Sequence, residues 1–403
     1  MNVFLFSETF PYGFGETFLE NELPFLADEF EQVVIIPLHK KEGIRALPSN
    51  VTVWDPIIGF SPKDRKRMLR NGIFNLSPIG FSAKDFFDKK VFSNKKWCWN
   101  FFTSLFLFRA MASNKKLWKQ LAHKVQAEDI LYFYWGDKSV LILPSLKRKI
   151  QNKAFVRFHR TDLYEYAKNG YIPFRKYIFS SIDHFLPISE NGKQYLIQHY
   201  PQTIDPSKIK VNRLGVFDNG LNLEINNSVP FHLVSCSYMV PVKRIALIVE
   251  SLKHISFPLK WTHIGTGVLF DEIRCKTNSL PENVEIDLKG VMSNAEVINF
   301  YQQNHVDLFI NVSESEGVPV SIMEALSFGI PVAATDVGGT AEIVDEKVGK
   351  LLPKDITAND IAQTISNFKS LSKQNDFRKN ARVQWSELCD AKKNYLEFVK
   401  LLI

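Results

Sequence analysis

The stretch of residues 311–344 constrains the fold of this chain more than any other. An apolar run of strand length, residues 307–312, is followed by a polar loop and then by a helical pattern that opens at Pro319. Proline suits the first helical turn, where a missing N–H costs nothing, and Gly329 followed by a second proline supplies the stop signal. Another apolar run, residues 331–335, comes next. The order strand, loop, helix, strand predicts a βαβ unit of a parallel sheet.

Two glutamates bracket the junction between this loop and the helix. Glu316 ends the strand region, and Glu324 follows on the expected helix. Ligands of open parallel sheets bind at strand carboxyl ends, where N–H groups of the helix start, such as that of Val320, also favour anions. Carboxylates accept hydrogen bonds from sugar hydroxyls. The pair therefore predicts a site for a polyhydroxylated, phosphate-bearing ligand, with two solvated helix-end glutamates as the alternative.

The same segment resembles the donor-site motif of retaining glycosyltransferases with the GT-B architecture, especially those of family four. The shared pattern covers Glu316, Gly317, Glu324, Ala325, Gly329, Pro331, Val332, Gly338, Gly339 and Glu342. The resemblance implies that Glu316 contacts the donor sugar near the reacting centre and that Glu324 binds the ribose hydroxyls. It also places Gly317, Val318 and Val320 around the donor. Pro319 departs from the glycine that is frequent in the family, so one backbone donor is missing.

The length of 403 residues is too great for one ordinary core and predicts two domains of about 150 to 200 residues each. The resemblance implies an α/β fold of the GT-B class, with two Rossmann-like domains that face a central cleft. We assign residues 1–215 to an acceptor-side domain and residues 216–380 to a nucleotide-sugar-binding domain. Residues 381–403 are expected to cross back as a helix to the first domain, which carries a mainly helical insertion at about residues 59–125.

A glycine-containing loop follows the first expected strand, residues 2–6. Gly13 and Gly15 allow the backbone to approach a ligand closely. The loop lacks the third glycine of a dinucleotide fingerprint, which argues against the rival reading of a nicotinamide-dependent oxidoreductase. The resemblance implies that this loop contacts the donor phosphate and the acceptor, with Glu16 on the acceptor side.

A histidine ends the expected strand at residues 154–158. His159 opens a polar loop that contains Asp162, at the carboxyl edge of a parallel strand. A hydrogen-bonded structural histidine is the alternative. The segment resembles the H-G-x-D motif of the family, in which the histidine lies against the donor sugar, although Arg160 replaces the usual small residue. The resemblance thus implies a catalytic role for His159 and an acceptor-side position for Asp162.

Two basic residues, Lys243 and Arg244, precede a helix after the expected strand at residues 232–237. Relatives read G-R-x-x-x-x-K-G here; Lys243 matches the lysine, whereas Tyr238 occupies the arginine position, which makes Arg244 the candidate second cation. The resemblance implies that both neutralise the donor diphosphate, and that the backbone near Met292 meets the nucleobase. No Asp-x-Asp is placed to hold a metal, so we expect none. Solvated side chains are the alternative.

Positive charge is concentrated in one aromatic segment of the first half. The chain has a net charge of +7 and a pI of about 9.0. The basic residues of this segment are Lys63, Arg65, Lys66, Arg67, Arg70, Lys84, Lys89, Lys90, Lys95, Lys96, Arg109, Lys115, Lys116 and Lys119. Mixed with many Phe and Trp residues, they indicate either a surface that rests on anionic lipid or a helical subdomain with a solvated basic face. The longest apolar run, residues 101–108, is too short to span a bilayer.

These features together predict a retaining glycosyltransferase. We expect it to move a sugar from a UDP-sugar or GDP-sugar to a hydroxyl of a glycan or lipid-linked acceptor in cell-surface polysaccharide or glycolipid synthesis, with no cofactor and no nucleic-acid partner. Widely spaced cysteines and the lack of a secretory signal favour the cytoplasm, peripherally on the cytoplasmic membrane face. The alternative is a non-catalytic glycosyltransferase-like scaffold or chaperone, because Tyr238 and Pro319 depart from the motif.

Overall fold

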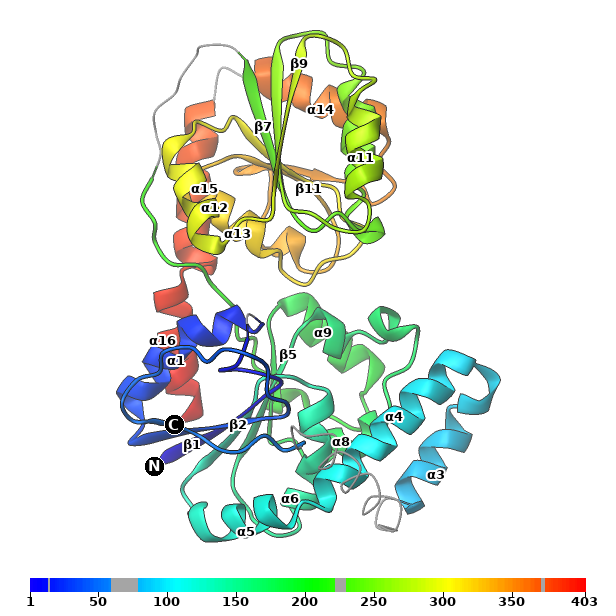
Figure 1. Ribbon diagram of the computed structural model, residues 1–403, viewed down its shortest axis with the longest axis vertical. Coiled ribbons are helices and arrows are strands. Elements are labelled where there is room, and N and C mark those ends of the chain that lie inside the picture. Colours follow the sequence, from blue (N-terminus) through cyan, green and yellow to red (C-terminus); the bar gives the residue numbers. More distant parts are fainter. Residues whose placement is uncertain (14, 59–78, 222–229, 371–373) are drawn as a thin grey trace. The chain divides into compact units, whose positions relative to one another are not determined.

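The computed structural model describes residues 1–13, 15–58, 79–221, 230–370 and 374–403. It divides into two compact units: unit 1 comprises Met1–Asn212 and Tyr395–Ile403, and unit 2 comprises Arg213–Asn394. Each unit contains a six-stranded parallel sheet covered by helices (Figure 1).

The sheet of unit 1 has the order β3-β2-β1-β4-β5-β6. Its strands are β1 (Asn2–Ser7), β2 (Gln32–Pro37), β3 (Val51–Val53), β4 (Ile130–Phe133), β5 (Ala154–Phe158) and β6 (His184–Pro187). The central strands read as continuous apolar runs because helices cover both of their faces. Strand order reverses between β1 and β4, so the carboxyl ends of these two strands flank a topological switch point, where open α/β sheets bind ligands.

Two groups of helices cover this sheet. On one face lie α1 (Thr17–Glu29) and the carboxy-terminal α16 (Ala391–Leu402), with the rings of Phe25 and Tyr395 5.6 Å apart. The other face packs against α4 (Lys95–Ala112), α5 (Lys115–Lys124), α6 (Leu143–Leu146) and α8 (Arg175–Phe179). Successive residues of β1 alternate between the two cores: Leu5 joins the core beside α1, whereas Phe6 stacks on Phe133 with 4.3 Å between ring centroids.

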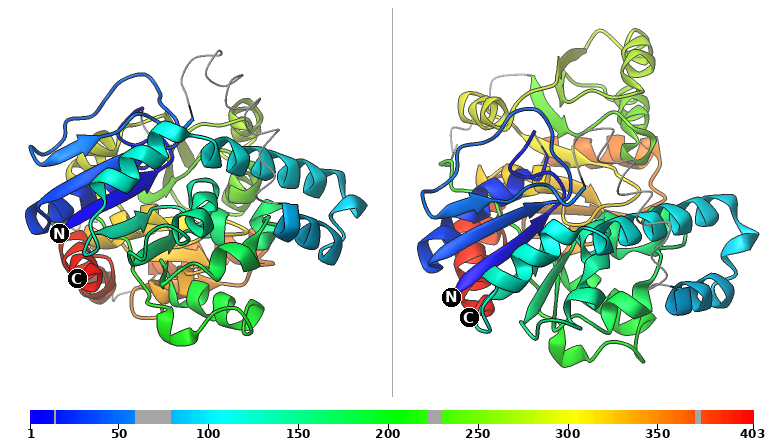
Figure 2. Two further views of the ribbon diagram at one scale, coloured as in Figure 1. Left: turned by 90° about the horizontal axis from the view of Figure 1, so that it is seen from below. Right: turned by 60° about the horizontal axis from the view of Figure 1, so that its bottom comes forward.

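The described part of the predicted insertion is helical. It comprises α3 (Ile79–Asp88), the 3₁₀ turn η1 (Val91–Ser93), α4 and α5. Residues 59–78, which include Lys63, Arg65, Lys66, Arg67 and Arg70, lie outside the described residues. In both views of Figure 2, α3 and one end of α4 extend beyond the sheet of unit 1. Within the described ranges, no helix combines the length and apolar character needed to cross a membrane.

The sheet of unit 2 has the order β12-β11-β10-β7-β8-β9. Its strands are β7 (Phe231–Cys236), β8 (Leu259–Ile264), β9 (Val284–Gly290), β10 (Leu308–Asn311), β11 (Val332–Thr335) and β12 (Gly349–Leu352). The helices are α10 (Ile245–Leu252), α11 (Phe270–Thr277), α12 (Asn294–Gln303), α13 (Val320–Ser327), α14 (Ala358–Ser370) and α15 (Gln374–Leu388). The order reverses between β7 and β10, which defines a second switch point.

The unit limits differ from the sequence-based domain limits mainly near the carboxyl terminus. The first boundary was expected after residue 215, and unit 1 ends at Asn212. The return to unit 1 comes at Tyr395, whereas it was expected from residue 381. The reason is that α15 packs against α13 of unit 2, where Arg382 donates a hydrogen bond from Nη1 to the Ser327 carbonyl oxygen at 2.6 Å.

Candidate active site

The switch point of unit 2 brings together a lysine and a glutamate that lie far apart in the sequence. Lys243 follows β7 in the 3₁₀ turn η5 (Pro241–Lys243), and Glu316 lies in the loop after β10. Lys243 Nζ lies 2.5 Å from Glu316 Oε1, to which Asn311 Nδ2 also donates at 3.2 Å. Glu316 is only 7% exposed. A buried carboxylate is thus held against a cation where strand order reverses, and ligand binding at this place stays a prediction.

The glycine turn of the motif packs directly on the backbone of Glu316. Gly338 has φ +59°, and a Cβ there would lie 2.0 Å from the Glu316 carbonyl oxygen. The next residue, Gly339, donates from its backbone N–H to the Gly317 carbonyl oxygen at 2.6 Å. A side chain at position 338 would therefore push the Glu316 loop out of place. The G-G element of the motif has a positioning function.

Glu324 lies on α13 and is only 6% exposed. Its Oε1 accepts a hydrogen bond from Asn294 Nδ2 at 2.6 Å. Burial raises the pKa of this carboxyl from 4.5 to about 7, against the opposing effect of the Asn294 hydrogen bond. Met292 is half-buried in the turn between β9 and α12, two residues before Asn294. Met292 is thus close in sequence to the hydrogen-bond partner of Glu324, and the contacts of Met292 with a nucleobase and of Glu324 with a ribose stay predictions.

The helix that carries Glu324 begins at Val320, with Pro319 as its N-cap residue. Pro319 has an extended backbone, and its carbonyl oxygen accepts hydrogen bonds from the N–H groups of Ile322 and Met323 at 3.1 and 3.2 Å. Proline therefore stands one position before the first helical turn in which it was expected. Val318 is buried, whereas Gly317 and Val320 are partly exposed at the helix start. Their contacts with a donor stay predictions.

Arg244 has a structural task that the sequence did not indicate. Its guanidinium donates from Nε to the Val312 carbonyl oxygen at 2.6 Å and from Nη1 to the Lys354 carbonyl oxygen at 2.7 Å. These bonds tie η5 to the end of β10, while Nη2 is buried with no hydrogen-bond partner among the described residues. Tyr238, at the position of the family's arginine, is 73% exposed. Contact of Arg244 with a diphosphate stays a prediction.

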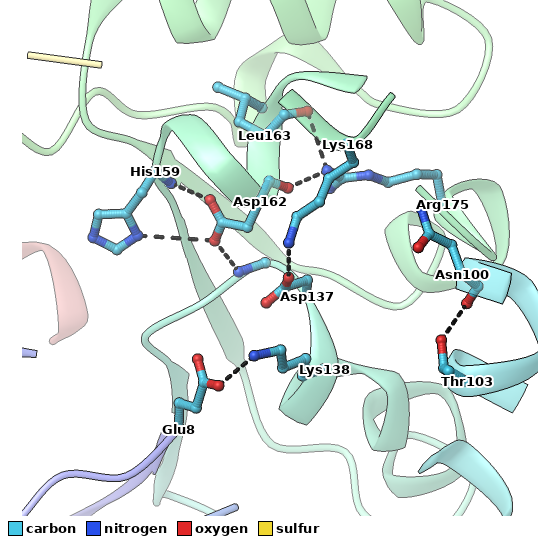
Figure 3. Close-up of polar contacts among 11 residues, drawn as sticks. Glu8, Asn100, Thr103, Asp137, Lys138, His159, Asp162, Leu163, Lys168 and Arg175 are labelled. Atoms are coloured by element: carbon cyan, nitrogen blue, oxygen red, sulfur yellow. Dashed lines mark hydrogen bonds and ion pairs between the residues drawn. The ribbon is translucent and has the colours of Figure 1, made fainter. Parts of the chain in front are cut away.

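In unit 1, His159 follows β5 and is the N-cap residue of α7 (Arg160–Leu163). Its ring packs against Tyr134 and Trp135, with centroid distances of 4.8 and 4.3 Å. The ring nitrogens are buried, and the described part of the chain offers neither of them a hydrogen-bond partner. The Nδ1 atom lies 3.8 Å from Asp162 Oδ2, which is too long for a hydrogen bond (Figure 3). His159 is thus fixed by ring packing, and its contact with a donor sugar stays a prediction.

Asp162 is fully buried, and its carboxylate is occupied by the backbone. Oδ1 accepts from His159 N–H and Oδ2 accepts from Gly136 N–H, both at 2.5 Å (Figure 3). Gly136 admits no side chain, because a Cβ would lie 2.2 Å from the Phe158 ring. Asp162 therefore joins the ends of β4 and β5 and positions His159. Its contact with the acceptor stays a prediction.

Glu16 also turns inward. It has a left-handed backbone with φ 56°, and its carboxylate accepts from the N–H groups of Glu8, Thr9 and Phe10 at 2.7 to 2.8 Å. Trp135 Nε1 donates to the same carboxylate at 2.8 Å. These four bonds order the loop after β1 instead of leaving Glu16 open to an acceptor, whose contact with this residue stays a prediction.

An arginine that sequence reasoning missed holds the glycine loop. Arg45 donates from Nε to the Gly13 carbonyl oxygen at 3.1 Å and from Nη2 to the Gly15 carbonyl oxygen at 2.7 Å. Gly13 has φ +70°, a conformation that favours glycine. Arg45 lies in a loop without a motif, so no local signal marked it. Across the described ranges, no group of three or more His, Cys, Asp or Glu residues is arranged to hold a metal ion.

Comparisons with known structures identify the class of fold. A structure of the lipopolysaccharide outer core galactosyltransferase WaaB covers 99% of this chain and 100% of its own, with a TM-score of 0.70 and 16% identity. A sucrose-phosphate synthase from Thermosynechococcus elongatus covers 100% and 98%, with a TM-score of 0.71 and 14% identity. Together with the two six-stranded sheets, these neighbours confirm the predicted GT-B fold of two Rossmann-like units.

Sequence comparisons identify the domain. Residues 225–384 match the family model described as "Glycosyl transferases group 1". The chain is 26% identical over 270 residues to the amylovoran biosynthesis glycosyltransferase AmsK of Erwinia amylovora, which covers 62% of each chain. It is 26% identical over 233 residues to the putative colanic acid biosynthesis glycosyltransferase WcaL of Escherichia coli, covering 55% of this chain and 56% of the relative. Each match spans about three fifths of the relative's own length.

Proposed function

We propose that this protein is a retaining glycosyltransferase of family four that uses a UDP-sugar or GDP-sugar and acts in cell-surface polysaccharide or glycolipid synthesis. The observation that carries the proposal is the ion pair between the partly exposed Lys243 and the buried Glu316 at the switch point of unit 2, inside the matched domain. The names of the two relatives, which refer to amylovoran and colanic acid, support a polysaccharide product.

The chemistry of the pair fits this reaction. The bond between the anomeric carbon and the diphosphate oxygen breaks, and its electrons leave with the diphosphate, which Lys243 and the N–H groups at the start of α13 stabilise. Positive charge develops on the sugar ring, where the Glu316 carboxylate stabilises it. The acceptor oxygen then bonds to the same face of the anomeric carbon, and its proton passes to the departing diphosphate. Glu324 holds the ribose hydroxyls throughout.

A panel of nucleotide diphosphate sugars tests donor binding. A ligand that binds the folded state raises the Tm by mass action. We expect a UDP-sugar or GDP-sugar to raise the Tm of the wild type and of Glu314→Ala, an exposed control on the same loop, but not that of Glu324→Ala. The anomeric configuration of the product, read by NMR, then tests retention. If no donor stabilises the wild type, the scaffold alternative replaces the enzyme.

We also propose that unit 1 rests on anionic membrane. The surface of α3, η1 and α4 exposes five aromatic rings: Phe87, Phe92, Trp99, Phe102 and Phe106. Three of them, Phe87, Phe92 and Phe102, surround Phe86 at centroid distances of 5.5 to 6.2 Å, so they form one patch. The exposed lysines of these elements and of the turn between α3 and η1 are Lys84, Lys89, Lys90, Lys95 and Lys96. Aromatic rings beside lysines match the interface of a bilayer with anionic headgroups.

Removing one ring of this patch tests the membrane proposal. Trp99 is 72% exposed, and Trp99→Ser should weaken binding to phosphatidylglycerol vesicles by about tenfold, because the indole no longer enters the interface. Flotation or vesicle co-sedimentation measures the change. Added salt should also weaken the binding of the wild type, because it screens the attraction between lysines and anionic headgroups. Tyr238→Ser is the matched control, since Tyr238 is equally exposed but belongs to unit 2. Equal loss in both variants would exclude the patch.

A further inference from the structure

Unit 1 contains a cavity of about 390 Å³ at its own switch point. Asp137 and Lys138, which follow β4, line it, and so does His39, which follows β2. Glu8, the residue after β1, reaches Lys138 at its edge (Figure 3). The cavity therefore lies outside the carboxyl ends of the strands between which the order reverses, the usual place of a ligand in such a sheet. Its volume is within the range of small-molecule sites.

The charges in this cavity are balanced. Lys138 is ion-paired with Glu8, and Lys168 Nζ lies 3.4 Å from Asp137 Oδ2. All four side chains remain partly exposed, so a ligand can reach them. A phosphate would have to compete with a carboxylate for each ammonium group, whereas sugar hydroxyls can donate to the carboxylates and accept from the lysines at the same time. The paired arrangement favours a neutral, polyhydroxylated ligand.

The backbone conformation of Lys138 supports a ligand-binding role for this side of the cavity. Lys138 has a left-handed conformation with φ 48°, which is uncommon for a residue with a side chain. Such conformations are found preferentially at ligand sites, where surrounding structure maintains them. Burial is the largest single effect and lowers the pKa of Lys138, but the hydrogen bond and charge of Glu8 act together with the charges of Asp137 and Glu16 and raise the pKa overall, so the lysine stays charged.

Helix α4 supplies the opposite wall. Asn100, Thr103, Ser104 and Leu107 line the cavity, and their spacing of three and four residues places them on one face of the helix. The exposed rings of Trp99, Phe102 and Phe106 have the same spacing and occupy an adjoining face. One helix thus places a polar cavity wall beside the aromatic patch. A molecule with a sugar joined to a lipid has both properties.

We propose that this cavity binds a neutral sugar residue of a lipid-linked acceptor, with its hydroxyls on the Glu8–Lys138 and Asp137–Lys168 pairs and its lipid beside the aromatic patch. The apolar side chains of Leu107, Ile172 and Pro173 complete the cavity and contact the C–H faces of the sugar ring. The role as acceptor site rests on the proposed glycosyltransferase function, whereas sugar binding in unit 1 is a separate property.

Saturation-transfer NMR on the full chain tests the inference. The probes are methyl glycosides of neutral hexoses, 6-deoxyhexoses and N-acetylhexosamines, with inorganic pyrophosphate as the anionic probe. We expect at least one glycoside to bind the wild type, and Thr103→Trp, which fills the cavity from an exposed position, to abolish its signal. Ser93→Trp is the matched control, because Ser93 is exposed on η1 away from the cavity lining. The double variant Asp137→Asn, Lys168→Met should bind the glycoside about tenfold more weakly.

Each other result would overturn the inference. Equal glycoside signals in the wild type and Thr103→Trp would place the sugar elsewhere, and no signal from any glycoside would exclude a neutral sugar ligand. Pyrophosphate that binds the wild type and is lost in Thr103→Trp, with no glycoside binding, would identify an anion site instead. The Tm increase caused by a nucleotide sugar should be the same in Thr103→Trp as in the wild type. Donor stabilisation without glycoside binding would reject this inference alone, whereas its absence would reject the proposed function.

Discussion

Replacing Glu316 with glutamine is expected to lower the turnover number for sugar transfer by about 10²- to 10³-fold, the usual cost of removing one preorganised electrostatic contact to a transition state. Glutamine has the same shape and its amide oxygen can still accept the hydrogen bond from Asn311. What disappears is the negative charge that faces the sugar ring as positive charge develops on it. The variant therefore separates charge from packing at this position.

Donor binding should change in the opposite direction. In the wild type, Glu316 partly neutralises Lys243 at 2.5 Å. Without that carboxylate, Lys243 attracts the donor diphosphate more strongly, so the Kd for the nucleotide sugar should stay the same or fall while kcat falls. Steady-state kinetics and a donor titration measure the two effects. Glu314→Gln, an exposed substitution two residues away, should leave both unchanged. Near-normal turnover by Glu316→Gln would remove Glu316 from the reaction.

The fold could be predicted from the sequence because parallel strands that are buried on both faces appear in it as uninterrupted apolar runs. The run at residues 307–312 contains β10 (Leu308–Asn311), and residues 2–6 fall within β1. The loop that contains Glu316 could be predicted for a different reason. Glu316, Gly338 and Gly339 meet through backbone contacts that allow little variation, and such constraints produce a recognisable motif.

The hydrogen-bond partners of the site residues could not be predicted from the sequence. Asn294 reaches Glu324 across 30 positions, and Trp135 reaches Glu16 across 119. Hydrogen bonds between such distant residues depend on tertiary packing and leave no local pattern. For the same reason the sequence did not predict the hydrogen bonds of Glu16 and Asp162. A carboxylate in a loop can either face a ligand or accept hydrogen bonds from nearby N–H groups. Only the structure shows that both carboxylates accept from backbone N–H groups.

The sequence contains part of the pattern of the unit 1 cavity, but neighbouring aromatic residues obscure it. The positions of Asn100, Thr103, Ser104 and Leu107 follow a helical period. They alternate with aromatic residues whose stronger hydrophobic signal dominates the segment. The lysine and carboxylate pairs add no sequence pattern, since Glu8 and Lys138 belong to different strand ends. Glu8 and Lys138 meet only because β1 lies beside β4 in the sheet.

Donor affinity is expected to rise with pH, by about tenfold per unit between about pH 5 and 7, because of Glu324. Its pKa of about 7 means that the carboxyl of the free protein is mostly protonated in this range. Ribose hydroxyls donate to the ionised form, so binding must first remove the proton. Both phosphates of a nucleotide sugar are already ionised here, and the donor itself contributes no titration. Calorimetric titration in two buffers should also detect release of a proton on binding.

The stability of the free protein gives an independent measurement of the same group. A carboxyl with a raised pKa binds its proton more tightly in the folded state, so its favourable effect is complete below pH 4.5 and is lost as the pH rises to about 7. The loss is about 3 kcal/mol of the free energy of unfolding. Glu324→Gln resembles the protonated side chain and should be more stable than the wild type above pH 7 by up to this amount, but equally stable near pH 4.

The donor affinity of Glu324→Gln should be low and nearly independent of pH. A wild-type affinity that is also flat from pH 5 to 8 would mean that the donor does not contact Glu324, and the ribose assignment would then be wrong.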